Sequence, residues 1–361
     1  MDQPSKNEAD VYRRLARHLD SLPAGFPATE SGVELRILRK LFSEQEAALA
    51  LALRMRPESV TKICQRLDLS AAELEPELLK MSKKGLIFRL EKGDLTLYMA
   101  SQFVVGIWEY HVNDLDEELI HDVNEYVPQL LAKSWDQMDT QQLRVIPVAE
   151  SLDSETSIMP YEAAEQIIAE QSAIVVAPCI CRKEQKMVGA GCDAPMEACF
   201  IFGSASTFYK DNGLGREISQ AEALELLQVG LDAGLVLQPS NAQKPVNICM
   251  CCGCCCQVLK NLKKIPHPAK MIAANYFVKV DEELCIACGD CAERCHMEAI
   301  TIATAAVVDL NRCIGCGVCV PVCDYDALVI KPKAPEARTL PPETMVKTFM
   351  QMAQERAQSS S

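Results

Sequence analysis

Apolar residues recur at helical spacing through the first eighty residues or so. VYRRLARHLD (11–20) and VELRILRKLF (33–42) are both amphipathic, and a Pro/Gly-rich linker separates them. Two later helices each begin with a serine that has a glutamate three residues further on, which is the pattern of a capping box. These pairs are Ser43 with Glu46 and Ser70 with Glu73. The pattern therefore predicts a helical N-terminal part.

A hairpin is predicted directly after these helices. Gly85 stands where a helix C-cap glycine is expected, and LIFRLE and DLTLYM flank the turn signal Lys92-Gly93. Helices followed by a hairpin give the order of a winged helix-turn-helix. We therefore expect an N-terminal helix and linker at 1–30 and a winged-helix-like domain at 31–110.

Acidic residues dominate positions 111–170. Fourteen Asp or Glu stand there against two basic residues, Lys133 and Arg144. Apolar residues are interleaved at helical spacing, which predicts a folded helical segment with an acidic surface. That surface is either a solvated face or a docking site for a basic partner, and the pattern leaves both open.

The second half of the chain alternates strand, helix and cysteine-rich segments. SAIVVAPCICR (172–182) reads as a strand and SQAEALELLQVGLDAG (219–234) as a helix, while NICMCCGCCC (247–256) is packed with cysteine. We expect an acidic helical and cysteine-rich domain at 111–274, a cysteine-run module at 275–331, and a tail at 332–361 that is Pro-rich, then weakly helical, and forms a peripheral arm. The predicted fold class is α+β.

The composition of the chain limits the classes of protein and the cellular compartments to which it can belong. The chain has 361 residues, 49% hydrophobic, with a formal net charge of −14 and only 5% aromatic residues. An acidic, aromatic-poor chain is a poor binder of nucleic acid. No apolar stretch is long enough to cross a bilayer, and the first residues do not read as a secretory signal. The 19 cysteines, many at close spacing, indicate metal binding in a reduced compartment. We expect a cytoplasmic protein of anaerobic metabolism.

Two runs of four cysteines share the spacing C-x2-C-x2-C-x3-C and stand 28 residues apart. EAITI follows the first run and DALVI the second, so the runs form an internal repeat. Between the runs, AITIATAAVVDL fits two short strands. Gly289, Gly315 and Gly317 permit tight loops whose N–H groups face sulfide. In the bacterial two-cluster pattern, the fourth cysteine of each run ligates the other cluster. The predicted ligands are Cys285, Cys288, Cys291 and Cys323 for cluster 1, and Cys313, Cys316, Cys319 and Cys295 for cluster 2.

Residues 275–331 resemble the bacterial-type ferredoxin family with two 4Fe–4S clusters. Structural zinc fits less well, because zinc sites use two CxxC pairs and not two interlocked runs. The family pattern has proline after the fourth cysteine, whereas His296 and Asp324 stand there in this chain. His296 either donates a hydrogen bond to a cluster sulfur, which would raise the reduction potential of that cluster, or has a structural role. The negative charge of Asp324 would lower the reduction potential of a nearby cluster.

A second set of ten cysteines lies upstream. It comprises Cys179, Cys181, Cys192, Cys199, Cys249, Cys251, Cys252, Cys254, Cys255 and Cys256. We expect one or two additional 4Fe–4S clusters between the 179–199 and 249–256 segments. The alternative is one cluster with a redox-active thiol pair or a zinc site.

Alternation along an extended chain suggests how this second set divides. It places Cys179 and Cys181 on one face and groups Cys252, Cys254 and Cys256 apart from Cys249, Cys251 and Cys255. Arg182 either compensates cluster charge, contacts an anionic substrate or forms an ordinary salt bridge. Cys64 stands apart on a predicted helix and is expected to be buried.

Residues from about 30 to 331 also resemble a group of 4Fe–4S dicluster-domain proteins of anaerobes. The phrases that carry this are KKGLIF, FVVGIWEY, APCICR, GCDAPMEACF, NGLGREIS and PSNAQKPVNICMCCGCCC. The resemblance implies the same three-part layout and an anaerobic setting, but no particular reaction. A histidine is expected after GCD in that group; Ala194 stands here.

No motif for an organic cofactor is present: G-x-G-x-x-G, the P-loop and G-x-S-x-G are all missing, and the five histidines show no metal-ligand pairing. We therefore expect an electron-transfer protein or a subunit of an anaerobic oxidoreductase complex, acting with a redox partner protein, more than a stand-alone enzyme.

Two alternatives remain, a redox-responsive winged-helix transcription regulator and an enzyme with a catalytic site-differentiated cluster. Residues 30–100 have a net charge of only +1, and the predicted recognition helix begins with glutamates. Both features favour protein docking over DNA binding.

Overall fold

A computed structural model describes residues 10–152 and 158–359, a mixed arrangement of helices and strands. The chain divides into two compact units. The first contains the residues up to Gln137 together with Ser204–Leu214 and the end of the chain from Arg356. The second contains Met138–Gly203 and Gly215–Glu355. Each unit is described by itself.

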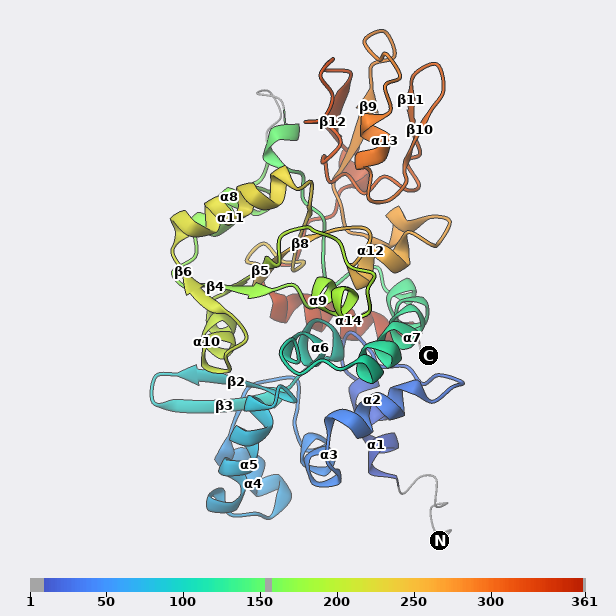
Figure 1. The fold of residues 1–361 in the computed structure, drawn as a ribbon. Helices are drawn as coiled ribbons and strands as arrows, with labels where there is room; N and C mark the ends of the chain where they lie inside the picture. Colours follow the sequence, from blue (N-terminus) through green and yellow to red (C-terminus); the bar gives the residue numbers. More distant parts are fainter. Residues whose placement is uncertain (1–9, 153–157, 360–361) are drawn as a thin grey trace. The chain divides into compact units, whose positions relative to one another are not determined.

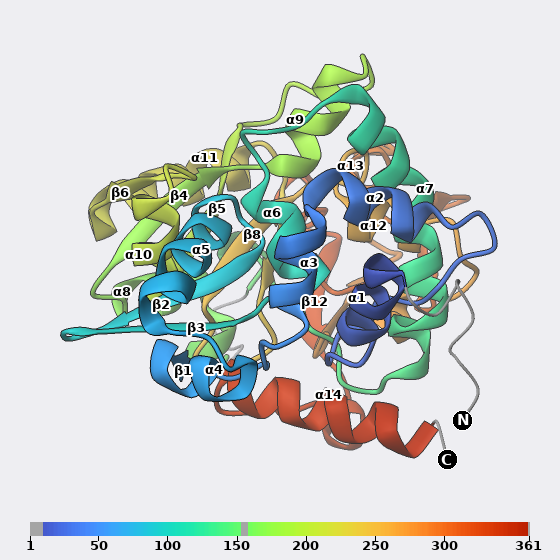
Figure 2. The same cartoon turned by 90° about the horizontal axis from the view of Figure 1, so that it is seen from below.

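The first unit is mainly helical, with one small sheet (Figures 1 and 2). Its helices are α1 (Val11–Asp20), α2 (Val33–Leu41), α3 (Glu44–Ala50), α4 (Val60–Leu67), α5 (Ala71–Lys83), α6 (Trp108–Tyr110), α7 (Glu117–Lys133) and α10 (Ser204–Asp211). Both predicted capping boxes are confirmed, at the starts of α3 and α5. Because each box satisfies otherwise unpaired N–H groups, these helices begin where the sequence predicts.

A three-stranded antiparallel sheet completes this unit. Its order is β1-β3-β2, from β1 (Glu58–Ser59), β2 (Ile87–Lys92) and β3 (Leu95–Ala100). Gly85 has a φ of 80°, the left-handed conformation expected after the helix end, and the hairpin turns at the predicted place. The ring of Phe208 in α10 packs on Phe88 and Tyr110, with centroids 4.8 and 4.7 Å apart.

The second unit is built on a five-stranded antiparallel sheet of order β6-β4-β5-β8-β7 (Figure 1). The strands are β4 (Ile174–Pro178), β5 (Glu197–Phe202), β6 (Arg216–Ile218), β7 (Val236–Pro239) and β8 (Asn247–Cys251). Helices α8 (Ala164–Ala169) and α11 (Gln220–Asp232) pack on each other, and α11 contacts β4 and β5. Helices α9 (Ile180–Met187) and α12 (Gln257–Leu262) begin next to cysteines.

Residues 275–331, the C-terminal module, belong to the second unit. Strand β9 (Tyr276–Val280) pairs with β12 (Leu328–Pro332), and β10 (Ile300–Ile302) pairs with β11 (Ala306–Val308). A short helix, α13 (Asp290–Arg294), lies within the first cysteine run and contains Cys291. The predicted strand pair between the runs is confirmed. The module has its own buried core, in which Val278 and Ile330 pack with Cys291 and Cys319.

Several local predictions are wrong. The 172–182 segment is extended only to Pro178, because Cys179 is the N-cap of α9 and Arg182 lies inside that helix. Within the described part of 111–170, the helical residues are those of α7, the shorter α8 and three 3-10 turns, so the segment is helical only in part. Cys64 is only partly buried.

The tail also differs from the expected peripheral arm. It forms α14 (Met345–Ser359), in which the hydroxyl of the fully buried Thr348 donates to the Asn241 carbonyl at 2.6 Å.

Candidate iron–sulfur and thiolate centres

A pocket in the C-terminal module, the first module cavity, collects thiols from both cysteine runs. It is lined by Cys285, Cys288, Cys291 and Cys323, together with apolar residues such as Ile286 and Leu328. The N–H of Ala306 donates to the Cys285 sulfur at 3.3 Å. Such a donor stabilises a thiolate that carries cluster charge.

A second pocket, the second module cavity, lies in the same module and has the complementary set of thiols. Its cysteines are Cys295, Cys313, Cys316 and Cys319. Burial raises the pKa of Cys316 to about 12, so this thiol needs a bound cation to become a thiolate near neutral pH. The structure thus brings together the two interlocked sets that the spacing predicts, with one thiol crossing over in each direction.

Glycine shapes the loop at the second module cavity. Gly315 has a φ of 64°, and a Cβ there would lie 2.1 Å from the carbonyl oxygen of Tyr276. Gly317 has a φ of 75°, and its Cβ would meet the Ser151 hydroxyl at 2.3 Å. The loop therefore requires glycine for both conformation and space.

The two residues at the expected proline positions differ in environment. His296 lies 2.7 Å from the Gly234 carbonyl through Nε2, and Arg294 donates to the carbonyl of Asp232 at 3.0 Å. Both contacts fasten the module to the C-terminal end of α11, where a cation is electrostatically favoured. This favours the structural interpretation of His296. Asp324 is exposed to solvent.

Six of the ten upstream cysteines form one connected set, which we call the inner thiol group. Its members are Cys179, Cys181, Cys199, Cys249, Cys251 and Cys256. Cys199 and Cys249 are directly opposed in β5 and β8, with their sulfurs 3.7 Å apart. Thiol–thiol hydrogen bonds then link Cys249 to Cys251, Cys251 to Cys256, Cys256 to Cys181 and Cys181 to Cys179.

Two inner thiols lie at helix N-termini. Cys179 is the N-cap of α9 and Cys256 that of α12, and each sulfur accepts backbone N–H groups of its own helix. The hydrogen bond from Cys181, aided by the charge of Arg182, lowers the pKa of Cys179 to about 7. The contact with Cys199 instead raises the pKa of Cys249. So dense a set of thiols becomes fully anionic only when a metal centre compensates its charge.

Polar side chains also donate to the inner thiol group. Gln238 Nε2 lies 3.7 Å from the Cys256 sulfur, and Asn247 Nδ2 lies 3.5 Å from that of Cys249. Donors of this kind tune the potential of a cluster. Sequence reasoning missed both residues. Asn247 begins the cysteine-rich strand, but Gln238 comes from β7 and is brought there only by strand pairing.

The remaining four upstream cysteines form a separate, compact set, the outer thiol group. Its members are Cys192, Cys252, Cys254 and Cys255, whose sulfurs all lie within 4.8 Å of one another. Cys192 comes from the loop after α9, and the other three come from the turn after β8. Cys252 and Cys255 are buried, whereas Cys254 is exposed.

The observed division of thiols corrects the alternation prediction. Cys255 joins Cys252 and Cys254, while Cys256 joins Cys249 and Cys251. The cause is that β8 ends at Cys251, so residues from Cys252 onward form a turn, to which strand alternation does not apply.

Arg182 lies between the two groups, fully buried. Its guanidinium donates to the carbonyl oxygens of Pro195 at 2.6 Å and Met250 at 2.5 Å, and it also hydrogen-bonds Cys252. Among the described residues, no carboxylate lies within ion-pair distance of Arg182, which disfavours the salt-bridge interpretation. Its charge instead faces thiols, as the charge-compensation interpretation requires.

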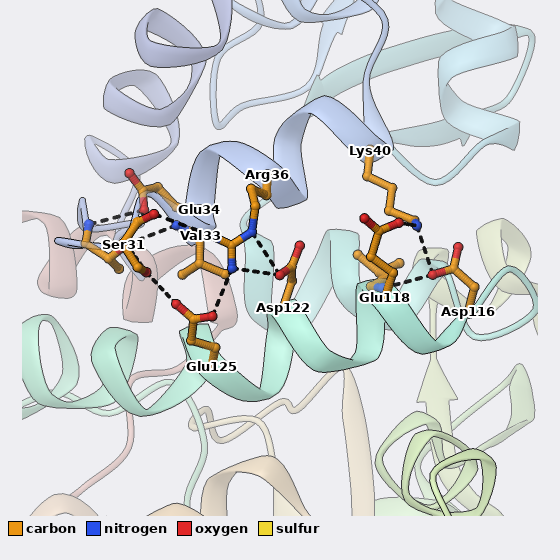
Figure 3. Close-up of polar contacts among 11 residues, drawn as sticks. Ser31, Val33, Glu34, Arg36, Lys40, Asp116, Glu118, Asp122 and Glu125 are labelled. Atoms are coloured by element: carbon orange, nitrogen blue, oxygen red, sulfur yellow. Dashed lines mark hydrogen bonds and ion pairs between the residues drawn. The ribbon is translucent and has the colours of Figure 1, made fainter.

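The acidic residues of α7 and its N-cap have basic partners in α2 of the same unit (Figure 3). Arg36 of α2 contacts Asp122 and Glu125 of α7, both at 2.9 Å. Lys40 contacts Asp116 at 3.0 Å and also Glu118. Part of the acidity of α7 is thus neutralised by α2.

Comparison with known proteins locates one domain. Residues 284–327 match the family model of the 4Fe–4S dicluster domain. No curated protein and no solved structure matches the chain. Among the described helices, none is long and apolar enough to cross a membrane. The domain match and the clustered thiols show that this is an iron–sulfur-binding protein, and they support electron transfer as its role.

Proposed function

We propose that the protein carries electrons between a partner oxidoreductase and two 4Fe–4S clusters in the C-terminal module, with a third cluster in the inner thiol group. Cys285, Cys288, Cys291 and Cys323 would hold cluster 1, and Cys313, Cys316, Cys319 and Cys295 would hold cluster 2. The observation that carries this proposal is that each module cavity is lined by one of these sets, taken from both runs.

The third cluster would draw its ligands from the six inner thiols. Support comes from the helix N-termini at Cys179 and Cys256, and from the amide donors that Gln238 and Asn247 direct at sulfur. The C-terminal module adjoins this region, because His296, next to Cys295, contacts Gly234 in the turn between α11 and β7. An added cluster there would extend the two-cluster module into a longer electron path.

Residues 31–110 would serve as a winged-helix-like docking domain for the partner protein. The succession α4, α5, β2 and β3, with β1 as a third strand, supports this layout. Glu73 and Glu75, in the first turns of α5, are exposed. A helix that presents carboxylates there repels the phosphate backbone of DNA. A DNA fragment shifted in a gel by the holoprotein, with an affinity that falls as salt rises, would instead favour the regulator.

Iron and acid-labile sulfide per chain test the cluster proposal. We expect about twelve of each in protein purified without oxygen, because three cubanes carry four of each. Cys249→Ser should lower both by about four and remove one set of reduced-state EPR signals, while Cys64→Ser, outside every thiol group, should change neither. About eight irons in the unaltered protein would remove the third cluster from the proposal and leave the module intact.

A further inference from the structure

The outer thiol group has a geometry different from that of the module cavities. The sulfur–sulfur distances are 3.8 Å from Cys192 to Cys252, 3.6 Å from Cys192 to Cys255, and 3.7 Å from Cys254 to Cys255. A disulfide has a sulfur–sulfur bond of only about 2 Å, so these thiols are not paired covalently. The four sulfur atoms therefore lie close together without a covalent bond between them.

These distances equal the edge of a single metal–thiolate tetrahedron. With four metal–sulfur bonds of about 2.3 Å in tetrahedral geometry, neighbouring sulfurs stand about 3.8 Å apart. A cubane instead gives each thiolate its own iron at a separate corner, which spreads the four sulfurs much farther. Among the described residues, the thiols of the module cavities and the inner group form no such set of three or more within 4.8 Å.

We propose that Cys192, Cys252, Cys254 and Cys255 bind one tetrahedral metal ion, Zn²⁺ or Fe²⁺, and not a 4Fe–4S cluster. Tetrahedral all-sulfur coordination is typical of these two metals. The site is independent of the third cluster proposed above, because it shares no thiol with the inner group.

The surroundings fit a doubly negative centre of one divalent ion and four thiolates. Arg182 provides a buried positive charge that hydrogen-bonds Cys252, and the Ala194 N–H donates to Cys192. The Arg182 Nε has no hydrogen-bond partner among the described atoms, so a further donor is available close to the thiolates. Such outer contacts orient ligands and balance charge in metal–thiolate sites.

The ion would join two segments beside the second module cavity. It ties the loop that contains Cys192 to the turn 252–255, and Gly253 in that turn lies against His296. A Cβ at Gly253 would stand 2.4 Å from the His296 carbonyl oxygen, so the turn and the module are in close contact. A zinc ion here fixes this contact, whereas an iron ion also adds a one-electron centre next to cluster 2.

Metal-selective spectroscopy on the full chain, purified without oxygen, tests the proposal. We expect about one ion per chain beyond the cluster iron, seen either as zinc or as iron in excess of sulfide. X-ray absorption at the zinc edge should show four sulfurs at about 2.3 Å; if the metal is iron, Mössbauer spectra should show a mononuclear tetrathiolate component. Either result supports the single-ion site and identifies the metal.

Variants assign the ion to these residues. Cys254→Ser, at the exposed ligand, should lower its occupancy at least tenfold without changing acid-labile sulfide, whereas Cys249→Ser and Cys64→Ser should retain it. If Cys254→Ser does not fold, Cys254→His keeps a zinc-type ligand, and the coordination shell should then change to three sulfurs and one nitrogen. A loss of about four sulfides in Cys254→Ser or Cys254→His would show a cluster instead, and an ion retained with an unchanged shell would place it elsewhere. Both outcomes overturn the proposal.

Discussion

Replacement of Gly315 by alanine tests how the C-terminal module shapes the second module cavity. Gly315 lies in the loop between Cys313 and Cys316 with a φ of 64°. An L-residue in this left-handed conformation costs about 1–2 kcal/mol. The added Cβ would also lie 2.1 Å from the backbone oxygen of Tyr276.

Tyr276 cannot easily move away from that methyl group. Its backbone is paired with Pro332 in the β9–β12 sheet, and its hydroxyl donates to Glu162 at 2.9 Å. Overpacking against a fixed neighbour typically costs a further 1–3 kcal/mol or so. The total destabilisation of the loop is thus about 2–5 kcal/mol.

Gly289→Ala is the matched control in the same module, because Gly289 also has a positive φ, of 100°, and nothing lies within 4 Å of the added Cβ. The difference of about 1–3 kcal/mol between the variants corresponds to roughly a 5–150-fold faster loss of one cluster in Gly315→Ala. Visible absorbance followed in the presence of an iron chelator measures the rate, and EPR identifies the cluster lost. Equal rates in the two variants would refute the steric reasoning.

Three further predictions follow from contacts outside the thiol groups. Arg36→Ala should destabilise the first unit by about 1–3 kcal/mol in a thermal melt, because the substitution removes the cation that contacts the buried carboxylate of Asp122. Lys40→Ala should cost less than about 1 kcal/mol in the same assay, because the acidic partners of Lys40 are exposed. Burial lowers the pKa of His111, so the unfolded chain binds a proton first as pH falls below about 6.5. The free energy of unfolding should then decrease by up to about 1.4 kcal/mol per pH unit. Thermal melts at pH 7.5 and 5.5 should show a smaller loss of stability in His111→Gln than in the unaltered protein. An equal loss in the two proteins would exclude His111 as the cause. Arg294→Gln removes a cation from the C-terminal end of α11. Amide hydrogen exchange there should become faster, corresponding to a loss of about 1 kcal/mol in the free energy of local opening. The effect should be confined to that end of the helix, because the contact is local.

Local sequence signals predicted much of the fold. Both capping boxes, the hairpin after Gly85 and the strand pair between the cysteine runs depend on residues close in sequence, and all are confirmed. The 4Fe–4S dicluster domain was also readable from the spacing of its cysteines alone. The prediction failed at 179–182, where a strand turns into a helix within two residues.

The sequence by itself determined that this chain binds iron–sulfur clusters, because a cluster loop is short and its ligand spacing is written in consecutive residues. It also provided the ten upstream thiols, but not their division. Pairing of β5 with β8 sets Cys199 opposite Cys249, and the end of β8 at Cys251 places Cys255 with Cys192. Those partners are 50 to 63 residues apart, so only the folded sheet and the turn that leaves it bring their sulfurs together.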